Sequence, residues 1–218
     1  METRTIFNSG RRNYKSYYMN KGRIETFTDG VIAIIITLMV LSIKLPHLTT
    51  TTGMVLLRHI SIYGLSFISI AIIWLNHHNM FMVIEKVDTR TIWANIFLLF
   101  FMSLIPLPTK ALGEDFFERE SHVFFGIILT ATSITYSILQ TMIISTMAKV
   151  STENKTNTNR LNWFASLLYA SSIPLSFISV YLSTFIFILI PIVYFIPTKK
   201  LHLVNNTASK PVSKEAMI

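Results

Sequence analysis

The longest uncharged stretch of the chain, residues 161–196, constrains the fold more than any other feature. It contains no Asp, Glu, Lys or Arg. A helix on the surface of a soluble protein keeps one polar face, whereas this stretch carries no charged residue on any face. It is too long for one membrane span, which needs about 20 apolar residues, and it suits a hairpin of two. We expect two transmembrane helices with a turn near residues 176–179.

Further apolar runs precede this hairpin. They cover residues 24–45, 55–77, 91–107 and 123–147, and prolines follow the first and the third. Only 14% of the residues are charged and 51% are hydrophobic, whereas soluble domains carry about a quarter charged residues. The sequence therefore predicts an all-α integral membrane protein with six transmembrane helices in one domain, residues 23–198. No signal-peptide cleavage site follows the first run, so we expect it to be retained as a helix.

The positive charges predict the orientation of these helices. Fifteen of the 19 Lys and Arg residues lie before helix 1, between helices 2 and 3, between helices 4 and 5, or after helix 6. The opposite side holds Lys44, Arg58, Lys110 and Arg119 beside an acidic stretch. Because basic loops stay in the cytoplasm, both termini are expected there. Residues 1–22 would form a basic cytoplasmic segment, and residues 199–218 a cytoplasmic tail.

Several function classes find no support in the sequence. Without cysteine there is neither a disulfide scaffold nor a Cys-ligated zinc site. The net charge of +8 is explained by membrane topology rather than by nucleic-acid binding. No nucleophile elbow, phosphate-binding loop or paired-carboxylate motif is present, so we expect no enzyme and no cofactor. A carbonyl filter loop of the TVGYG type is also absent from the sequence.

Helix 1 carries unusual chemistry for a membrane span. Arg23, Glu25 and Asp29 lie at its cytoplasmic edge. A carboxylate is costly in the bilayer, so Asp29 should face protein or water, either as a structural partner or in ion or proton transfer. Helix 2 ends on the same side with Trp74, Asn76, His77 and His78, whose N–H groups could offset the desolvation of Asp29. The adjacent histidines point about 100 degrees apart on a helix, which argues against a shared metal ion.

Farther along helix 1, aliphatic side chains form one stripe. Ile34, Leu38 and Leu41 follow one another at helical spacing, and Thr37 lies beside them. Such a stripe is ordinary in packed helices, so periodicity alone does not make it part of a pore.

Three segments together resemble one family. The stretch from Arg23 through Phe27, Thr28 and Asp29 resembles the R-x-x-x-F-S-D signature of the transmembrane protein 175 family of potassium channels, with Thr28 in place of the usual serine. The segments YGLSFISIAIIWLNHHNMF and NIFLLFFMSLIPLPTKAL resemble its second and third helices. The resemblance covers residues 21–112 well, and the last three helices agree in hydropathy and length.

The resemblance implies a bacterial six-helix member of the family in the cell membrane. It also implies a homotetramer with helix 1 around a central pore that conducts K⁺ in preference to Na⁺. It implies that Ile34, Leu38 and Leu41 form a hydrophobic constriction, and that the Thr37 hydroxyl assists cation selectivity. Arg23, Phe27, Thr28 and Asp29 would hold helix 1 against its neighbours, through Trp74, Asn76 and His77.

Two other functional hypotheses remain. The first is a proton-coupled transporter or a proton-conducting channel that uses Asp29 and His77. No inverted repeat supports the transporter. The second is a membrane enzyme, motivated only by the pair His77 and His78.

Overall fold

The structure is a computed structural model that describes residues 19–43, 52–82, 84, 86–146 and 152–195. The expected cytoplasmic tail at residues 199–218 and nearly all of the basic segment at 1–22 lie outside these residues. The described part of the chain forms seven helices and two short strands. The helices are α1 (Lys21–Leu41), α2 (Thr52–Met82), α3 (Thr89–Ser103), α4 (Pro106–Glu114), α5 (Arg119–Thr146), α6 (Thr152–Ser176) and α7 (Val180–Phe195).

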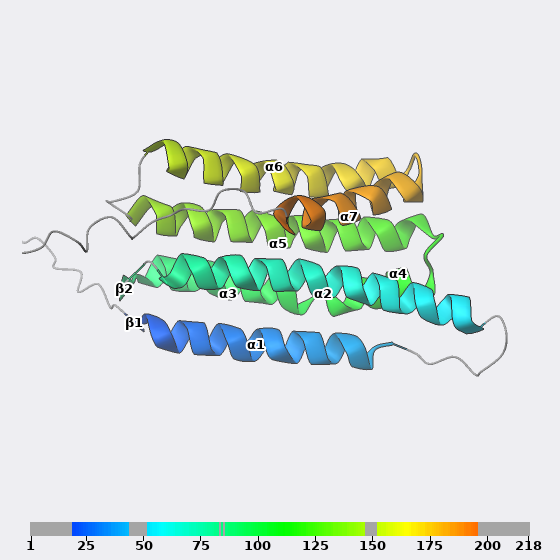
Figure 1. The fold of residues 1–218 in the computed structure, drawn as a ribbon, viewed down its shortest axis with the longest axis horizontal. Coiled ribbons are helices and arrows are strands. Elements are labelled where there is room, and N and C mark those ends of the chain that lie inside the picture. The colour runs from blue at the N-terminus through cyan, green and yellow to red at the C-terminus, as the bar shows by residue number, and fades with distance from the viewer. Residues whose placement is uncertain (1–18, 44–51, 83, 85, 147–151, 196–218) are drawn as a thin grey trace, which may run out of the picture.

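The helices run side by side along one axis and alternate in direction (Figure 1). α1 lies at one edge of the bundle and packs against α2, α3 and α4, while α5 packs against α3 and α6. Strands β1 (Met19–Asn20) and β2 (Lys86–Val87) pair antiparallel at one end. This ladder joins the start of α1 to the connection between α2 and α3. The starts of α1, α3 and α6 therefore lie at the same end as the last residues of α2 and α5, whereas α7 ends about halfway along the bundle.

Four helical segments are long and apolar enough to cross a membrane: α1, most of α2, α3 with α4, and α5. α7 is apolar but shorter. α6 opens with the polar sequence TENKTNTNR, which lowers its mean hydropathy, and its uncharged part begins at residue 161. The described part of the uncharged stretch, residues 161–195, forms a helical hairpin with its turn at residues 177–179. Each arm has about 16 uncharged residues, near the lower limit of a span.

The predicted end of the third span at residue 107 is wrong. α3 ends at Ser103, and α4 begins at Pro106 and continues to Glu114. Proline lacks an N–H group, so it interrupts α3, yet it is well suited to the first position of the next helix. The Ile105 carbonyl accepts from the backbone N–H of Thr109 at 3.1 Å and from its hydroxyl at 2.8 Å. The prolines thus break the helix without ending the span.

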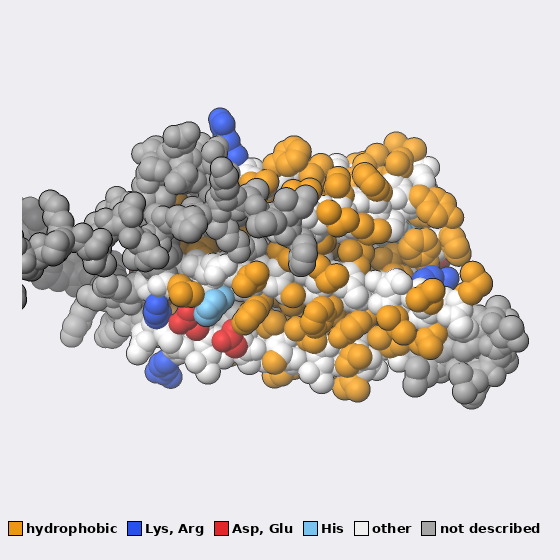
Figure 2. Space-filling view, in the orientation of Figure 1, with side chains coloured by type: hydrophobic (Ala, Val, Ile, Leu, Met, Phe, Trp, Pro, Cys, Tyr) orange, Lys and Arg blue, Asp and Glu red, His pale blue; other side chains and the backbone are white. Residues whose placement is uncertain are grey.

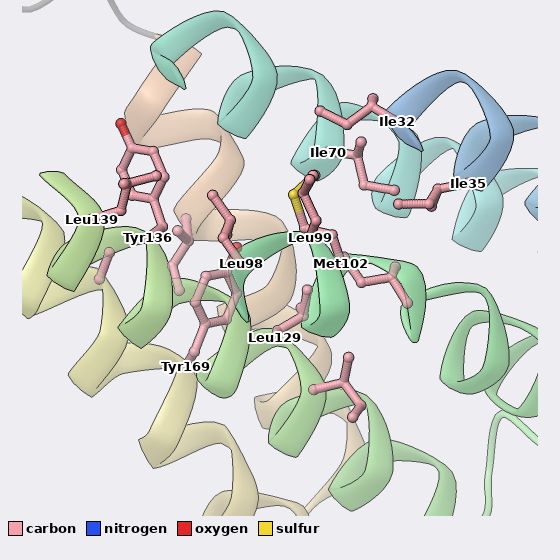
Figure 3. Packing of buried hydrophobic residues seen from close by; sticks show 14 of the residues in the cluster. Ile32, Ile35, Ile70, Leu98, Leu99, Met102, Leu129, Tyr136, Leu139 and Tyr169 are labelled. Carbon is pink, nitrogen blue, oxygen red and sulfur yellow. The ribbon is translucent and has the colours of Figure 1, made fainter. Parts of the chain in front are cut away.

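Apolar side chains from all helices fill the interior, as Figure 3 shows for residues of α1, α2, α3, α5 and α6. The contact between α5 and α6 is especially close at Gly126. A Cβ atom added there would lie 2.8 Å from the Ser172 hydroxyl and 3.1 Å from an Ile173 carbon. Small residues allow membrane helices to approach closely, and Gly126 has this role here.

Candidate functional site: helix α1 and its anchor

Helix α1 has one buried face and one exposed face. The buried face contains Ile24, Thr28, Ile32, Ile35 and Met39. The side chains of Ile34, Leu38 and Leu41 are 60%, 53% and 74% exposed on the opposite face. The helix is about 31 Å long, enough to cross the hydrocarbon core of a bilayer. A single chain therefore leaves the aliphatic stripe uncovered along the length of a possible span.

Asp29 lies at the border between these faces and pairs with α2. The indole N–H of Trp74 donates to Oδ1 of Asp29 at 2.7 Å. The Trp74 ring stacks on His78 with 5.9 Å between the ring centroids. A hydrogen bond from an uncharged donor offsets part of the cost of placing the carboxylate near the bilayer.

A second, buried network holds α1 against α2 and α3. His77 Nε2 lies 2.8 Å from Oδ1 of Asn95, and Nδ2 of Asn95 donates to the Thr28 hydroxyl at 2.9 Å. Because the Asn95 oxygen can only accept, His77 donates its Nε2–H group. The side chains of Thr28, Asn95 and His77 are 1%, 2% and 3% exposed. One asparagine thus connects three helices in the interior, where each polar group needs a partner.

The start of α1 is fixed by two further contacts. Oδ1 of Asn20 accepts from the backbone N–H of Gly22 at 3.0 Å and caps the helix. The ammonium group of Lys21 donates to the carbonyls of Phe81 and Met82 at 3.3 and 3.4 Å. These are terminal carbonyls of α2, where a positive charge is favourable. α1 is therefore anchored at the end of the bundle where β1 and β2 pair.

The structure separates the remaining candidate residues from this anchor. Arg23 and Phe27 are exposed, on the side of α1 that carries Ile34. Asn76 lines a cavity on another side of α2, among residues of α5, α6 and α7. Figure 2 shows acidic, basic and histidine side chains gathered near the anchored end of α1, with apolar side chains covering most of the same face beyond them.

Asn95 is a partner of α1 that we did not predict from the sequence. It was visible as an amide within an apolar run, but its rotation on the helix could not be read from the sequence. Histidines and carboxylates of the described residues form no group of three or more that could hold a metal ion.

Known proteins are similar to this chain in sequence. Residues 23–106 match the family described as the endosomal/lysosomal potassium channel TMEM175. A Chryseobacterium protein named as a potassium channel is 35% identical over 187 residues, covering 84% of this chain and 97% of that protein. A potassium channel of Chamaesiphon minutus is 33% identical over 177 residues, covering 74% of this chain and 87% of that protein.

A solved structure agrees with the fold. The crystal structure of a lysosomal potassium-selective channel TMEM175 homolog from Chamaesiphon minutus matches with a TM-score of 0.72 and 29% identity, covering 80% of this chain and 96% of that one. The fold and the match define a multi-pass helical membrane protein of an ion-channel class. The chain belongs to the TMEM175 family.

Proposed function

We propose that this chain is the subunit of a homotetrameric cation channel that conducts K⁺ in preference to Na⁺. Its relatives of 35% and 33% identity are named as potassium channels, and they align over most of their own length. The observation that carries the proposal is the two-faced α1 helix, anchored at one end and uncovered along its aliphatic stripe. Four copies of that helix around one axis would enclose a pore.

The exposed face of α1 supports close approach between copies. Thr26, Gly30 and Ala33 are exposed and recur at helical spacing beside the aliphatic stripe. A Cβ atom at Gly30 would meet nothing within 4 Å in one subunit. Small residues at such positions let membrane helices pack tightly. We infer that this small-residue stripe contacts the neighbouring α1, which turns the aliphatic stripe toward the axis.

The constriction would then consist of aliphatic rings and no carbonyl filter. Four Ile34 side chains around a narrow axis exclude water, and rings of Leu38 and Leu41 follow farther along the helix. An ion cannot pass a dry constriction without losing its hydration shell, and a small widening admits water again. K⁺ holds its water less tightly than Na⁺, which favours K⁺ at a partly hydrated constriction.

Thr37 offers an oxygen to a passing cation. Its hydroxyl donates to the Ala33 carbonyl at 2.8 Å. Because its hydrogen is used within the helix, the hydroxyl oxygen presents lone pairs outward. A ring of such oxygens beside the constriction is suited to cations and not to anions.

The membrane position follows from the two ends of the bundle. We place the end with the starts of α1, α3 and α6 in the cytoplasm, because it carries most of the basic residues. Trp74, Trp93 and Trp163 are exposed and lie toward this end. Tryptophan is enriched at membrane–water interfaces, which agrees with the placement. The chain would thus cross a bacterial cell membrane six times, with both termini in the cytoplasm.

The test is the reversal potential of the purified tetramer in planar bilayers with opposing K⁺ and Na⁺ solutions. We expect a K⁺-selective potential for the wild type and larger currents for Ile34→Asn, because an amide hydrates the constriction. Val40→Asn is the matched control, since Val40 is 45% exposed on the same helix and lies about 120 degrees around it from Ile34. It should leave the current near that of the wild type.

The outcomes separate the alternatives. Equal effects of the two variants would mean that Ile34 does not line a pore. A potential that follows the proton gradient instead of K⁺ would favour the proton-conducting alternative. No current from a verified tetramer would contradict the channel.

A further inference from the structure

A cavity lies on the side of α2 that faces away from α1. Residues of α2, α5, α6 and α7 line it, and its volume is about 40 Å³. None of the described residues that line it is charged. Its polar lining consists of Ser69, Asn76, Ser133, Tyr136, Tyr169 and Tyr194. The remaining lining residues are aliphatic, alanine or proline.

Most of these hydroxyl groups already have protein partners. Ser69 donates to the Leu65 carbonyl at 2.9 Å, and the hydroxyls of Ser133 and Ser166 lie 2.8 Å apart. The Tyr194 hydroxyl donates to the side-chain oxygen of Asn162. These contacts join α5, α6 and α7 around the cavity, so its walls are fixed by hydrogen bonds and by packing.

Tyr136 differs from them. Its side chain is only 7% exposed and lines the cavity, and its hydroxyl takes no part in the hydrogen bonds that join the described residues around the cavity. In Figure 3 the ring of Tyr136 points from α5 into the interior of the bundle. A polar group that is shielded from bulk water and has no partner is unfavourable, so the Tyr136 hydroxyl favours an occupant that forms a hydrogen bond.

The chemistry of the lining defines the occupant. A charged molecule would lose its hydration without meeting an opposite charge, and a hydrocarbon would leave Tyr136 unpaired. The space corresponds to about three water molecules. We propose that this cavity binds a small neutral molecule with a hydroxyl group, of the size of a short-chain alcohol, which replaces water there.

The experiment is photolabelling of the full-length protein in lipid nanodiscs with azibutanol, a short alcohol that carries a diazirine. Mass spectrometry would locate the adducts. We expect saturable labelling of the tyrosines that line the cavity, competed by butanol and much less by pentane. Labelling that does not saturate, or that falls on lipid-facing residues alone, would overturn the proposal. So would equal competition by pentane, because the hydroxyl group would then be irrelevant.

Two variants sharpen the test. Ala165→Ile fills the cavity without removing a polar group, since Ala165 lines it and is buried. It should abolish the saturable labelling, while Ala170→Ile, at a half-buried position of the same helix, should preserve it. Tyr136→Phe should raise the half-saturating alcohol concentration about fivefold, the value of one hydrogen bond. Unchanged labelling in a folded Ala165→Ile protein would place the alcohol elsewhere. None of these measurements depends on ion conduction.

Discussion

Replacement of Asn95 by leucine tests whether the buried network stabilises the position of α1. Leucine has the same branched shape as asparagine but a larger volume, so the change removes hydrogen bonds without opening a cavity. The bonds to His77 and Thr28, at 2.8 and 2.9 Å, would both be lost. Hydrogen bonds between membrane helices contribute about 0.6 kcal/mol on average. A buried polar group left without a partner costs about 1–3 kcal/mol.

Both partners are almost completely buried, so the cost of leaving their polar groups unpaired adds to the loss of the two hydrogen bonds. We expect Asn95→Leu to lower the free energy of unfolding by about 2–4 kcal/mol. The assay is reversible unfolding by SDS in mixed micelles. Asn79→Leu is the matched control, because Asn79 is exposed on α2, and it should change the stability by less than about 0.5 kcal/mol.

A triple variant makes the reasoning refutable. Thr28→Val and His77→Phe, combined with Asn95→Leu, replace every member of the network by an apolar side chain of similar shape, and the larger volume of leucine is common to the single and the triple variant. When no polar group is left unpaired, the cost of burying one disappears. The triple variant should therefore be more stable than Asn95→Leu alone. If its loss equals or exceeds that of the single variant, unpaired polar groups are not the cause.

Two further predictions concern packing and pH. Gly126→Ala should destabilise the protein by about 1–3 kcal/mol in the same unfolding assay, because the new methyl group would overlap side chains of α6. Gly64→Ala is the control, since nothing lies within 4 Å of the added carbon, and its stability should be equal to or higher than that of the wild type. Asp88 caps α3, and hydrogen bonds from Thr91 lower the pKa of its carboxyl group. Its contribution is therefore present above its unfolded pKa of about 4 and is lost as the pH falls through the lower folded value. The stability difference between wild type and Asp88→Asn should shrink on acidification, and a constant difference would contradict this assignment.

The sequence predicted which helix ends meet, because antiparallel spans bring the start of one helix to the end of the next. This is why Trp74 could be named as a partner for Asp29 before the structure was known. Helical rotation was harder. Trp74 and His77 are three residues apart and share a face, whereas Asn76 points about 100 degrees away from His77. The helical spacing therefore explains why Asn76 faces the cavity rather than α1.

Helical spacing does not predict the contacts of α3. Which face of that helix meets α1 depends on packing across the bundle, so Asn95 could be noticed but not placed. The break between α3 and α4 was predicted as an end, because the sequence does not show whether a helix resumes after proline. It resumes here at Pro106, and the carbonyls of Met102 and Leu104, which the two prolines cannot serve, accept instead from the N–H groups of Ile105 and Leu107 at 3.1 Å.

The position of the anchor along α1 bears on how the proposed constriction would open. The polar contacts to α2 and α3 lie at Thr28 and Asp29, and apolar packing alone holds the buried face beyond them. Ile34 is about 8 Å along the helix from Asp29, and Leu41 is about 18 Å away. A tilt of α1 about the anchor would therefore move Leu41 more than twice as far as Ile34. In the proposed tetramer, Ile34 would thus be the part of the stripe best held at a fixed radius, which is what a narrow, water-excluding constriction requires.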